Sequence, residues 1–102
     1  TVIYPKGKNV STHLLAPDGS IAIRLLKDEF CKGLVYRYQR AIVSTSANIS
    51  GSPSPKDFSS VATEIKEQVD YILQSPQAKH ASAKPSKIVK LGLGGEFSLI
   101  RS

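Results

Sequence analysis

Residues 20–25 read SIAIRL and lead directly into residues 26–40, LKDEFCKGLVYRYQR. In the first part, apolar side chains occupy every second position, which is the period of a β-strand, and Arg24 falls on the opposite face. In the second part, apolar residues recur three and four positions apart, which predicts an amphipathic helix over residues 27–39. A strand followed at once by a helix is typical of an α/β protein.

The rest of the chain continues this alternation. Further strands are predicted at residues 1–4, 41–43, 71–73, 87–91 and 96–101. Further helices are predicted from Ser11 to Leu15 and from about Lys56 onward, where Phe58, Val61, Ile65 and Val69 fall at helical spacing. Gly92-Leu93-Gly94-Gly95 separates the last two strands and predicts a β-hairpin, whereas residues 74–86 predict a long loop. We therefore expect an α/β fold with a mixed sheet, flanking helices and a C-terminal hairpin.

Composition narrows the class of protein. The chain has 102 residues, of which 40% are hydrophobic and 22% charged, which argues against disordered, collagenous and membrane-spanning proteins. Cys31 is the one cysteine and forms no internal bridge, so a reducing, cytoplasmic compartment is expected. Since methionine is absent, even from position 1, we expect Thr1 to lie inside a longer protein.

The net charge of +6 favours polyanionic partners such as nucleotides, phosphates or RNA. A basic surface without a specific partner fits this modest excess equally well. The charge therefore bears on partners and not on the fold.

The stretch most suggestive of a binding site is Ser44–Gly51, STSANISG. It follows a predicted strand and precedes a predicted helix, where open α/β sheets bind ligands. Its hydroxyls, amide and glycine could hold a phosphate or carboxylate, although a serine-rich loop that caps the next helix is the simpler interpretation. Arg24 and Arg101 leave the same choice open, because each could grip an anion or lie on a solvated face of the sheet.

Other kinds of site are disfavoured. His13 and His80 lie far apart, with no acidic residue at metal-ligand spacing, which argues against zinc. Residues 92–95 lack the Lys-Ser/Thr pair of a P-loop. Cys31 falls on the apolar side of its predicted helix, where we expect a small core residue and not a nucleophile.

Five segments, in this order, resemble the YrdC family, which includes the bacterial threonylcarbamoyl-AMP synthases. They are Thr1–Ile3, Ser20–Arg24, Val43–Gly51, Lys84–Val89 and Leu99–Arg101. The resemblance covers essentially all 102 residues but only the C-terminal half of the family's catalytic domain. It implies a partial YrdC-like fold, with a twisted mixed sheet.

The resemblance also implies an enzyme of tRNA modification. Such enzymes condense L-threonine, bicarbonate and ATP into threonylcarbamoyl-AMP and release pyrophosphate, with Mg²⁺ expected on the phosphates. Partner proteins then transfer the threonylcarbamoyl group to adenosine 37 of tRNA. The resemblance implies that Arg24, Ser44 and Ser86 contact threonine. It also implies that ATP is bound by Ser46, Asn48, Arg101, Ser20 and Ser54. It gives no residue for catalysis or for a metal.

Three departures from the family pattern limit what the resemblance implies. The family's Lys-x-Arg element, which contributes cations for ATP, does not occur in this sequence. Lys87 stands where a threonine is usual, and Leu26 replaces a usual proline. We therefore expect residues 1–102 to be inactive alone, and to expose apolar surface and a free strand edge. Either the N-terminal half or self-association would cover that surface.

Two alternatives stay open. The first is a non-catalytic YrdC-like module that binds double-stranded RNA or tRNA, which the net charge of +6 favours. The second is a carbamoyl-transfer domain of the hydrogenase-maturation type, although the sequence contains no acylphosphatase-like or zinc-finger segment to favour it.

Overall fold

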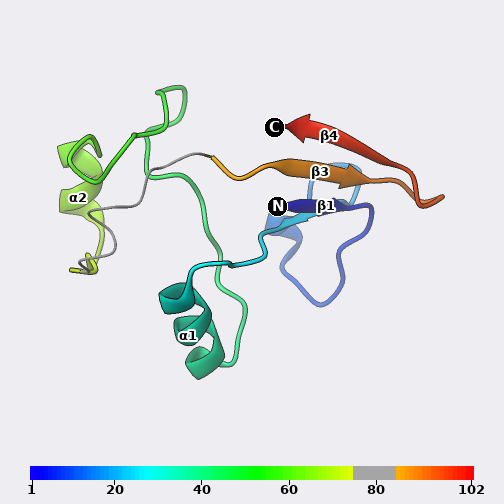
Figure 1. Ribbon diagram of the computed structural model, residues 1–102, viewed down its shortest axis with the longest axis horizontal. Helices are drawn as coiled ribbons and strands as arrows, with labels where there is room; N and C mark the ends of the chain where they lie inside the picture. The colour runs from blue at the N-terminus through cyan, green and yellow to red at the C-terminus, as the bar shows by residue number, and fades with distance from the viewer. Residues whose placement is uncertain (75–84) are drawn as a thin grey trace. The chain divides into compact units, whose positions relative to one another are not determined.

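A computed structural model describes residues 1–74 and 85–102 (Figure 1). The chain divides into two compact units. The first unit consists of Thr1–Ala41 and Ser86–Ser102, and the second of Ile42–Pro85. The loop predicted at 74–86 lies mostly outside the described residues, and His80 lies outside them.

The first unit is built on a four-stranded sheet of order β2-β1-β3-β4. Its strands are β1 (Val2–Tyr4), β2 (Ile21–Ile23), β3 (Ile88–Leu91) and β4 (Phe97–Arg101). β1 pairs antiparallel with β2 and parallel with β3, and β3 pairs antiparallel with β4 (Figure 1). The sheet is therefore mixed, and the predicted α/β fold class is confirmed.

The C-terminal hairpin is confirmed as well. The Gly92 amide donates a hydrogen bond to the Glu96 carbonyl over 2.7 Å, which closes the turn between β3 and β4. Gly95 has a φ of +84°, a backbone conformation that favours glycine. The turn needs this residue type, which explains why the glycine-rich segment predicted it.

The connection from β1 to β2 contains the predicted short helix, a 3₁₀ turn at Thr12–Leu14. Ser11 precedes it, and its Oγ accepts a hydrogen bond from the His13 amide over 3.3 Å. The connection is closed near β2, where the Ala16 amide donates to the Ser20 carbonyl over 2.9 Å. β2 itself ends at Ile23, two residues before Leu25, where the predicted strand ends.

Helix α1 (Glu29–Tyr38) fills most of the range predicted for it. Asp28 caps its N-terminus, since the carboxylate accepts a hydrogen bond from the Cys31 amide over 2.8 Å. This bond lowers the pKa of the Asp28 carboxyl. Cys31 is half-buried, and burial raises the pKa of its thiol. Gln39 ends the helix in the left-handed conformation, with a φ of 58°.

The second unit contains one regular element, the short helix α2 (Thr63–Gln68), among its described residues. The helix predicted from Lys56 begins later because Asp57 forms a turn instead. Its carboxylate accepts hydrogen bonds from the Ser60 hydroxyl and amide and from the Ser59 hydroxyl. These bonds, led by that of the Ser60 hydroxyl, lower the pKa of Asp57 to about 2. Side chains that bond to nearby backbone in this way compete with helix formation.

The strands predicted at residues 41–43 and 71–73 are wrong, because neither segment is part of a sheet. A short apolar run forms a strand only when a partner supplies the hydrogen-bonding ladder. Among the described residues, neither run has such a partner. Most of their side chains are open to solvent, with Val43 71% and Tyr71 78% exposed.

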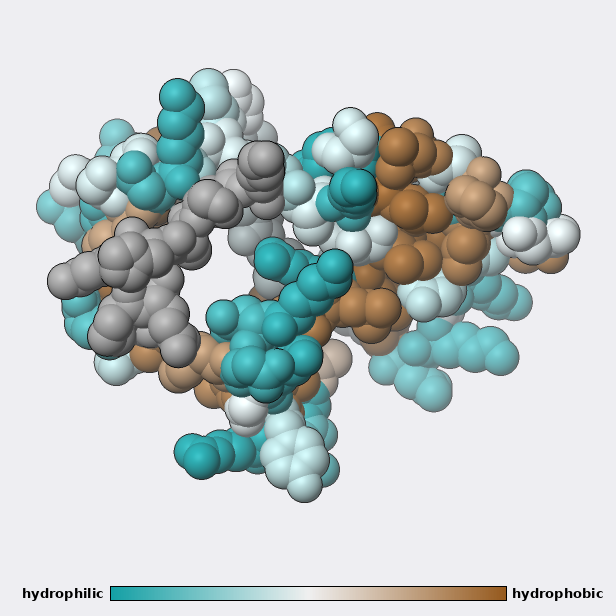
Figure 2. All heavy atoms as spheres, in the orientation of Figure 1, coloured by the Kyte–Doolittle hydropathy of each residue, from teal (hydrophilic) through white to brown (hydrophobic). Residues whose placement is uncertain are grey.

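No apolar side chain among the described residues is buried, and Ser20 is the one buried residue there, at 6% exposure. Figure 2 shows apolar side chains gathered at the surface of the sheet-bearing unit. α1 buries none of its residues, and Leu34 and Tyr36 are 50% and 76% exposed. The expected exposure of apolar surface is thus present. Within the described residues, no helix is long and apolar enough to cross a bilayer.

The cap of α1 yields the first prediction. Asp28→Ala removes the acceptor of the Cys31 amide, so amide exchange in the first turn of α1 should accelerate several-fold. Asp28→Asn is the matched control, because asparagine caps as well as aspartate. Because folding lowers the pKa of Asp28, the cap is fully present above its ordinary value of 3.8 and is lost as the pH falls further. An Asp28→Ala helix that exchanges like the unmodified one would contradict this role.

Candidate functional site

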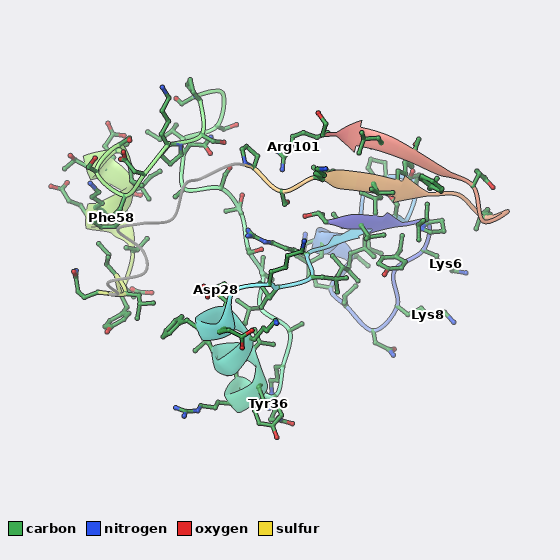
Figure 3. All side chains as sticks on the ribbon, viewed as in Figure 1. Lys6, Lys8, Asp28, Tyr36, Phe58 and Arg101 are labelled. Atoms are coloured by element: carbon green, nitrogen blue, oxygen red, sulfur yellow. The ribbon has the colours of Figure 1, made fainter. Side chains whose placement is uncertain are left out.

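Ser86 is held at two points where three segments of the first unit meet. It lies two residues before the first residue of β3, Ile88. Its hydroxyl and that of Thr1 share a hydrogen bond of 2.8 Å. Its carbonyl accepts two hydrogen bonds from Arg101, from Nε over 3.0 Å and from Nη2 over 2.7 Å. Figure 3 shows Arg101 at the end of β4, beside the start of β3.

The sheet explains why these residues meet. Parallel pairing of β1 with β3 places the start of β1 beside the start of β3. Antiparallel pairing of β3 with β4 places the end of β4 there as well. Ser86, assigned to threonine, and Arg101, assigned to ATP, thus lie in direct contact. The contact between Thr1 and Ser86 was not predicted from the sequence. It follows from the parallel pairing of β1 with β3, which no local sequence pattern indicates.

Arg24 and Ser20 lie at opposite ends of β2. β2 stops at Ile23, so the strand alternation that was expected to direct Arg24 ends one residue too early. The Arg24 side chain is exposed. Ser20 is buried, and its amide donates to the Asp18 carboxylate over 3.0 Å. This contact with Ser20 lowers the pKa of Asp18, and Lys90 lies 3.8 Å from the same carboxylate.

Asn48 fixes the turn in the serine-rich loop of the second unit. Its Nδ2 donates to the Ile49 carbonyl over 3.1 Å and to the Ser52 carbonyl over 2.9 Å. The opposite orientation of the amide would set its oxygen against both carbonyls, so the partners determine the orientation. Gly51 completes the turn with a φ of +85°.

This use of Asn48 bears on its expected role at the nucleotide phosphates. Both hydrogens of Nδ2 are spent on the loop, so the amide could donate to a phosphate only by releasing one carbonyl. Its Oδ1 is buried without a partner among the described residues. Asn48 also lines a hollow of about 130 Å³. The contact with phosphate therefore stays a prediction.

The other predicted residues divide between the units. Ser44, Ser46 and Ser54 are exposed and belong with Asn48 to the second unit. Arg24, Ser20, Ser86 and Arg101 belong to the first. Of these predicted residues, the structure shows only Ser86 and Arg101 in contact with each other. That the others share one binding site with them stays a prediction.

A second hollow was not foreseen from the sequence. It has a volume of about 320 Å³ and lies in the first unit, with Tyr4 and Ile21 among its apolar lining residues. Lys6 and Lys8 line it as well and project from their loop (Figure 3). None of the residues assigned to threonine or ATP lines it.

The acidic and metal-binding side chains of residues 1–74 and 85–102 are dispersed. No three of the His, Cys, Asp and Glu side chains described there come together in a way that could hold a metal ion. These residues do not fit a resident metal cofactor.

The loop around Asn48 yields the second prediction. Asn48→Asp replaces the two donated hydrogens by a carboxylate that faces two carbonyl oxygens, and should lower the free energy of unfolding by about 1 kcal/mol. Exchange of the Ser52 amide, which donates to the Ile49 carbonyl, should accelerate. Ser50→Ala, at an exposed position of the same loop, serves as the control. Unchanged exchange at Ser52 in Asn48→Asp would show that Asn48 does not hold the turn.

Comparisons with known proteins extend these observations. The family model for Sua5, YciO and YrdC, described as "Telomere recombination", matches residues 1–102. The threonylcarbamoyl-AMP synthase of Idiomarina loihiensis is 32% identical over 89 residues, which are 87% of this chain and 47% of the relative. That of Pseudoalteromonas translucida is 28% identical over 88 residues, 86% of this chain and 46% of the relative.

The synthase of Photobacterium profundum is 31% identical over 74 residues, which are 72% of this chain and 40% of the relative. The chain thus spans about half the length, or less, of these curated relatives. No solved structure matches it. Which half of the family's domain the chain represents stays a prediction, because the family match covers every residue given. The match over residues 1–102 shows that the chain belongs to the Sua5/YciO/YrdC family.

Proposed function

We propose that the chain forms part of an enzyme that makes threonylcarbamoyl-AMP from L-threonine, bicarbonate and ATP. Membership of the family and the names of three relatives support this proposal. The structural observation that carries it is the contact between Ser86, Thr1 and Arg101, which holds the Ser86 hydroxyl in one place, and the exposed Arg24 guanidinium belongs to the same unit. Hydroxyl and guanidinium groups are suited to carboxylate and phosphate ligands.

The reaction proceeds in two steps, formation of a carbamate and transfer of the AMP group to it. The threonine amine adds to bicarbonate to give a carbamate, and water leaves. A carbamate oxygen then attacks the α-phosphorus of ATP, and the bond to the leaving pyrophosphate breaks. Negative charge gathers on carboxylate and phosphate oxygens, so cations and hydroxyls fixed near them stabilise the transition state.

Different residues would bind the two substrates, threonine and ATP. Arg24 would hold the threonine carboxylate, and Ser44 and Ser86 would contact threonine. The nucleotide would bind near the loop that carries Ser46 and Asn48. Since the described residues offer no cluster for a resident metal, Mg²⁺ would arrive bound to the ATP phosphates, as part of that substrate. The product would serve transfer proteins that modify adenosine 37 of tRNA.

The alternative is a module that binds double-stranded RNA or tRNA without adenylate chemistry, and the net charge of +6 supports it. An assay of pyrophosphate release separates the two functions, because a binding module would release none when supplied with threonine, bicarbonate and ATP.

Arg24 provides the test of the proposed function. The longest polypeptide that the gene encodes should form threonylcarbamoyl-AMP, detected by mass spectrometry together with released pyrophosphate. Arg24→Gln removes a charged partner of the threonine carboxylate and should raise the KM for threonine about 10- to 100-fold. Arg37→Gln, at an exposed position on α1, should leave the KM unchanged. No adenylate from the unmodified protein would refute the enzymatic proposal.

We further propose that additional polypeptide, equivalent to the N-terminal half of a family-length synthase, covers the exposed apolar surface. The first of two observations favours this occupant over a second copy of the chain, and the second shows which surface would be covered. The chain accounts for 47% of the Idiomarina loihiensis relative, and its described residues bury no apolar side chain. All five residues of β4, an edge strand, are exposed, Phe97 at 74% and Leu99 at 59%. Such an edge accepts another strand.

The covering of β4 can be measured by comparing residues 1–102 alone with the longest polypeptide that the gene encodes. The shorter chain should bind an apolar dye and exchange its β4 amides rapidly, whereas the longer one should protect them. A defined dimer of the shorter chain with protected β4 amides would instead identify a second copy as the occupant. A monomer of the shorter chain with protected amides and no dye binding would overturn the proposal.

A further inference from the structure

Arg101 reaches Ser86 through an irregularity in the β3–β4 ladder. Ile88 pairs with Arg101, while its neighbour Val89 pairs with Leu99, so Ile100 is an additional residue on β4. A bulge of this kind re-aims side chains near the end of a strand. Here the side chain of Arg101 ends on the carbonyl of Ser86, at the start of the adjacent strand.

The atoms that Arg101 uses are informative. Nε and Nη2 form one of the paired edges with which a guanidinium grips a carboxylate or phosphate. Both of these atoms donate to the same carbonyl oxygen of Ser86. A phosphate bound at that edge would have to displace the Ser86 carbonyl. The family assignment of Arg101 to ATP therefore competes with a contact that the fold already makes.

The other side of Ser86 is held as well. Its hydroxyl contacts the Thr1 hydroxyl over 2.8 Å, and the Thr1 nitrogen donates to the next carbonyl, that of Lys87, over 2.8 Å. β1 thus supports the hydroxyl side of Ser86, while β4 supports its carbonyl. Serine has one rotatable side-chain bond, so fixing its backbone leaves the hydroxyl few places to point.

We infer that Arg101 is a positioning residue, which fixes the Ser86 backbone so that the Ser86 hydroxyl is held ready for threonine. This inference rests on the proposed function and adds to it the means by which the threonine contact is oriented. Arg101 then acts on threonine through Ser86 and does not contact the nucleotide. Fixing a binding group before the ligand arrives lowers the cost of ordering it on binding.

The two roles of Arg101 predict different kinetics. As a positioning residue, Arg101→Gln should raise the KM for threonine about 10-fold and leave the KM for ATP within about 2-fold. Arg101→Lys keeps a donor that can reach one carbonyl, and should recover part of the threonine KM. As a nucleotide-binding residue, Arg101→Gln would raise chiefly the KM for ATP. Arg37→Gln is the matched control for loss of an exposed arginine.

A double-mutant cycle gives the sharper test. If Arg101 acts through Ser86, the Ser86→Ala, Arg101→Gln double variant should bind threonine no more than about 2-fold worse than Ser86→Ala alone. Independent roles would make the two effects multiply. The cycle is measured on the longest polypeptide that the gene encodes, both from KM and from threonine affinity by calorimetry. Multiplying effects, or a change confined to ATP, would overturn the inference.

A structural readout independent of activity completes the design. The carbonyl ¹³C resonance of Ser86 should move in Arg101→Gln and return part of the way in Arg101→Lys, because the donor to that carbonyl is lost and then partly restored. An unmodified protein that forms the adenylate while the cycle shows multiplying effects would refute only the role of Arg101. One that neither binds threonine nor releases pyrophosphate would refute the proposed function together with it.

Discussion

The parallel pairing of β1 with β3 is the constraint on which the first unit depends. It joins Val2 to Val89, so most of the chain lies between the paired residues. Without it, the β1–β2 pair and the β3–β4 hairpin would be two separate ribbons, and an isolated two-stranded ribbon is marginal in water. The entropic cost of closing so long a loop grows only slowly with its length, but contacts inside the sheet must offset it.

The described residues supply little apolar burial to offset that cost. Burying a leucine or isoleucine side chain fully contributes roughly 1.5–3 kcal/mol, while ordering the backbone of one residue costs about 1–2 kcal/mol. No apolar side chain in the described part of the chain is buried. Hydrogen bonds alone contribute modestly, because each replaces a bond to water. Among the described residues, the sheet and α1 therefore leave their apolar side chains partly or fully open to solvent.

Features set by local chemistry were predicted well from the sequence. The period of α1 and the glycine turn between β3 and β4 depend on neighbouring residues, and the structure confirms α1 and the hairpin. The runs at 41–43 and 71–73 look equally strand-like in isolation, but whether they pair depends on distant residues. The same holds for the contact between Thr1 and Ser86, which follows from register and not from either residue's neighbours.

The candidate site illustrates how far a motif can specify function. The resemblance implies that Asn48 and Arg101 bind ATP, yet both residues donate to carbonyls of their own chain. In each case, the donors hold a short segment that carries another polar group, the serine-rich loop or Ser86. A sequence motif contains residues that orient their neighbours as well as residues that contact the ligand, and it does not distinguish the two. Atomic partners separate the two roles, because a donor already satisfied within the fold must break that bond before it can bind substrate.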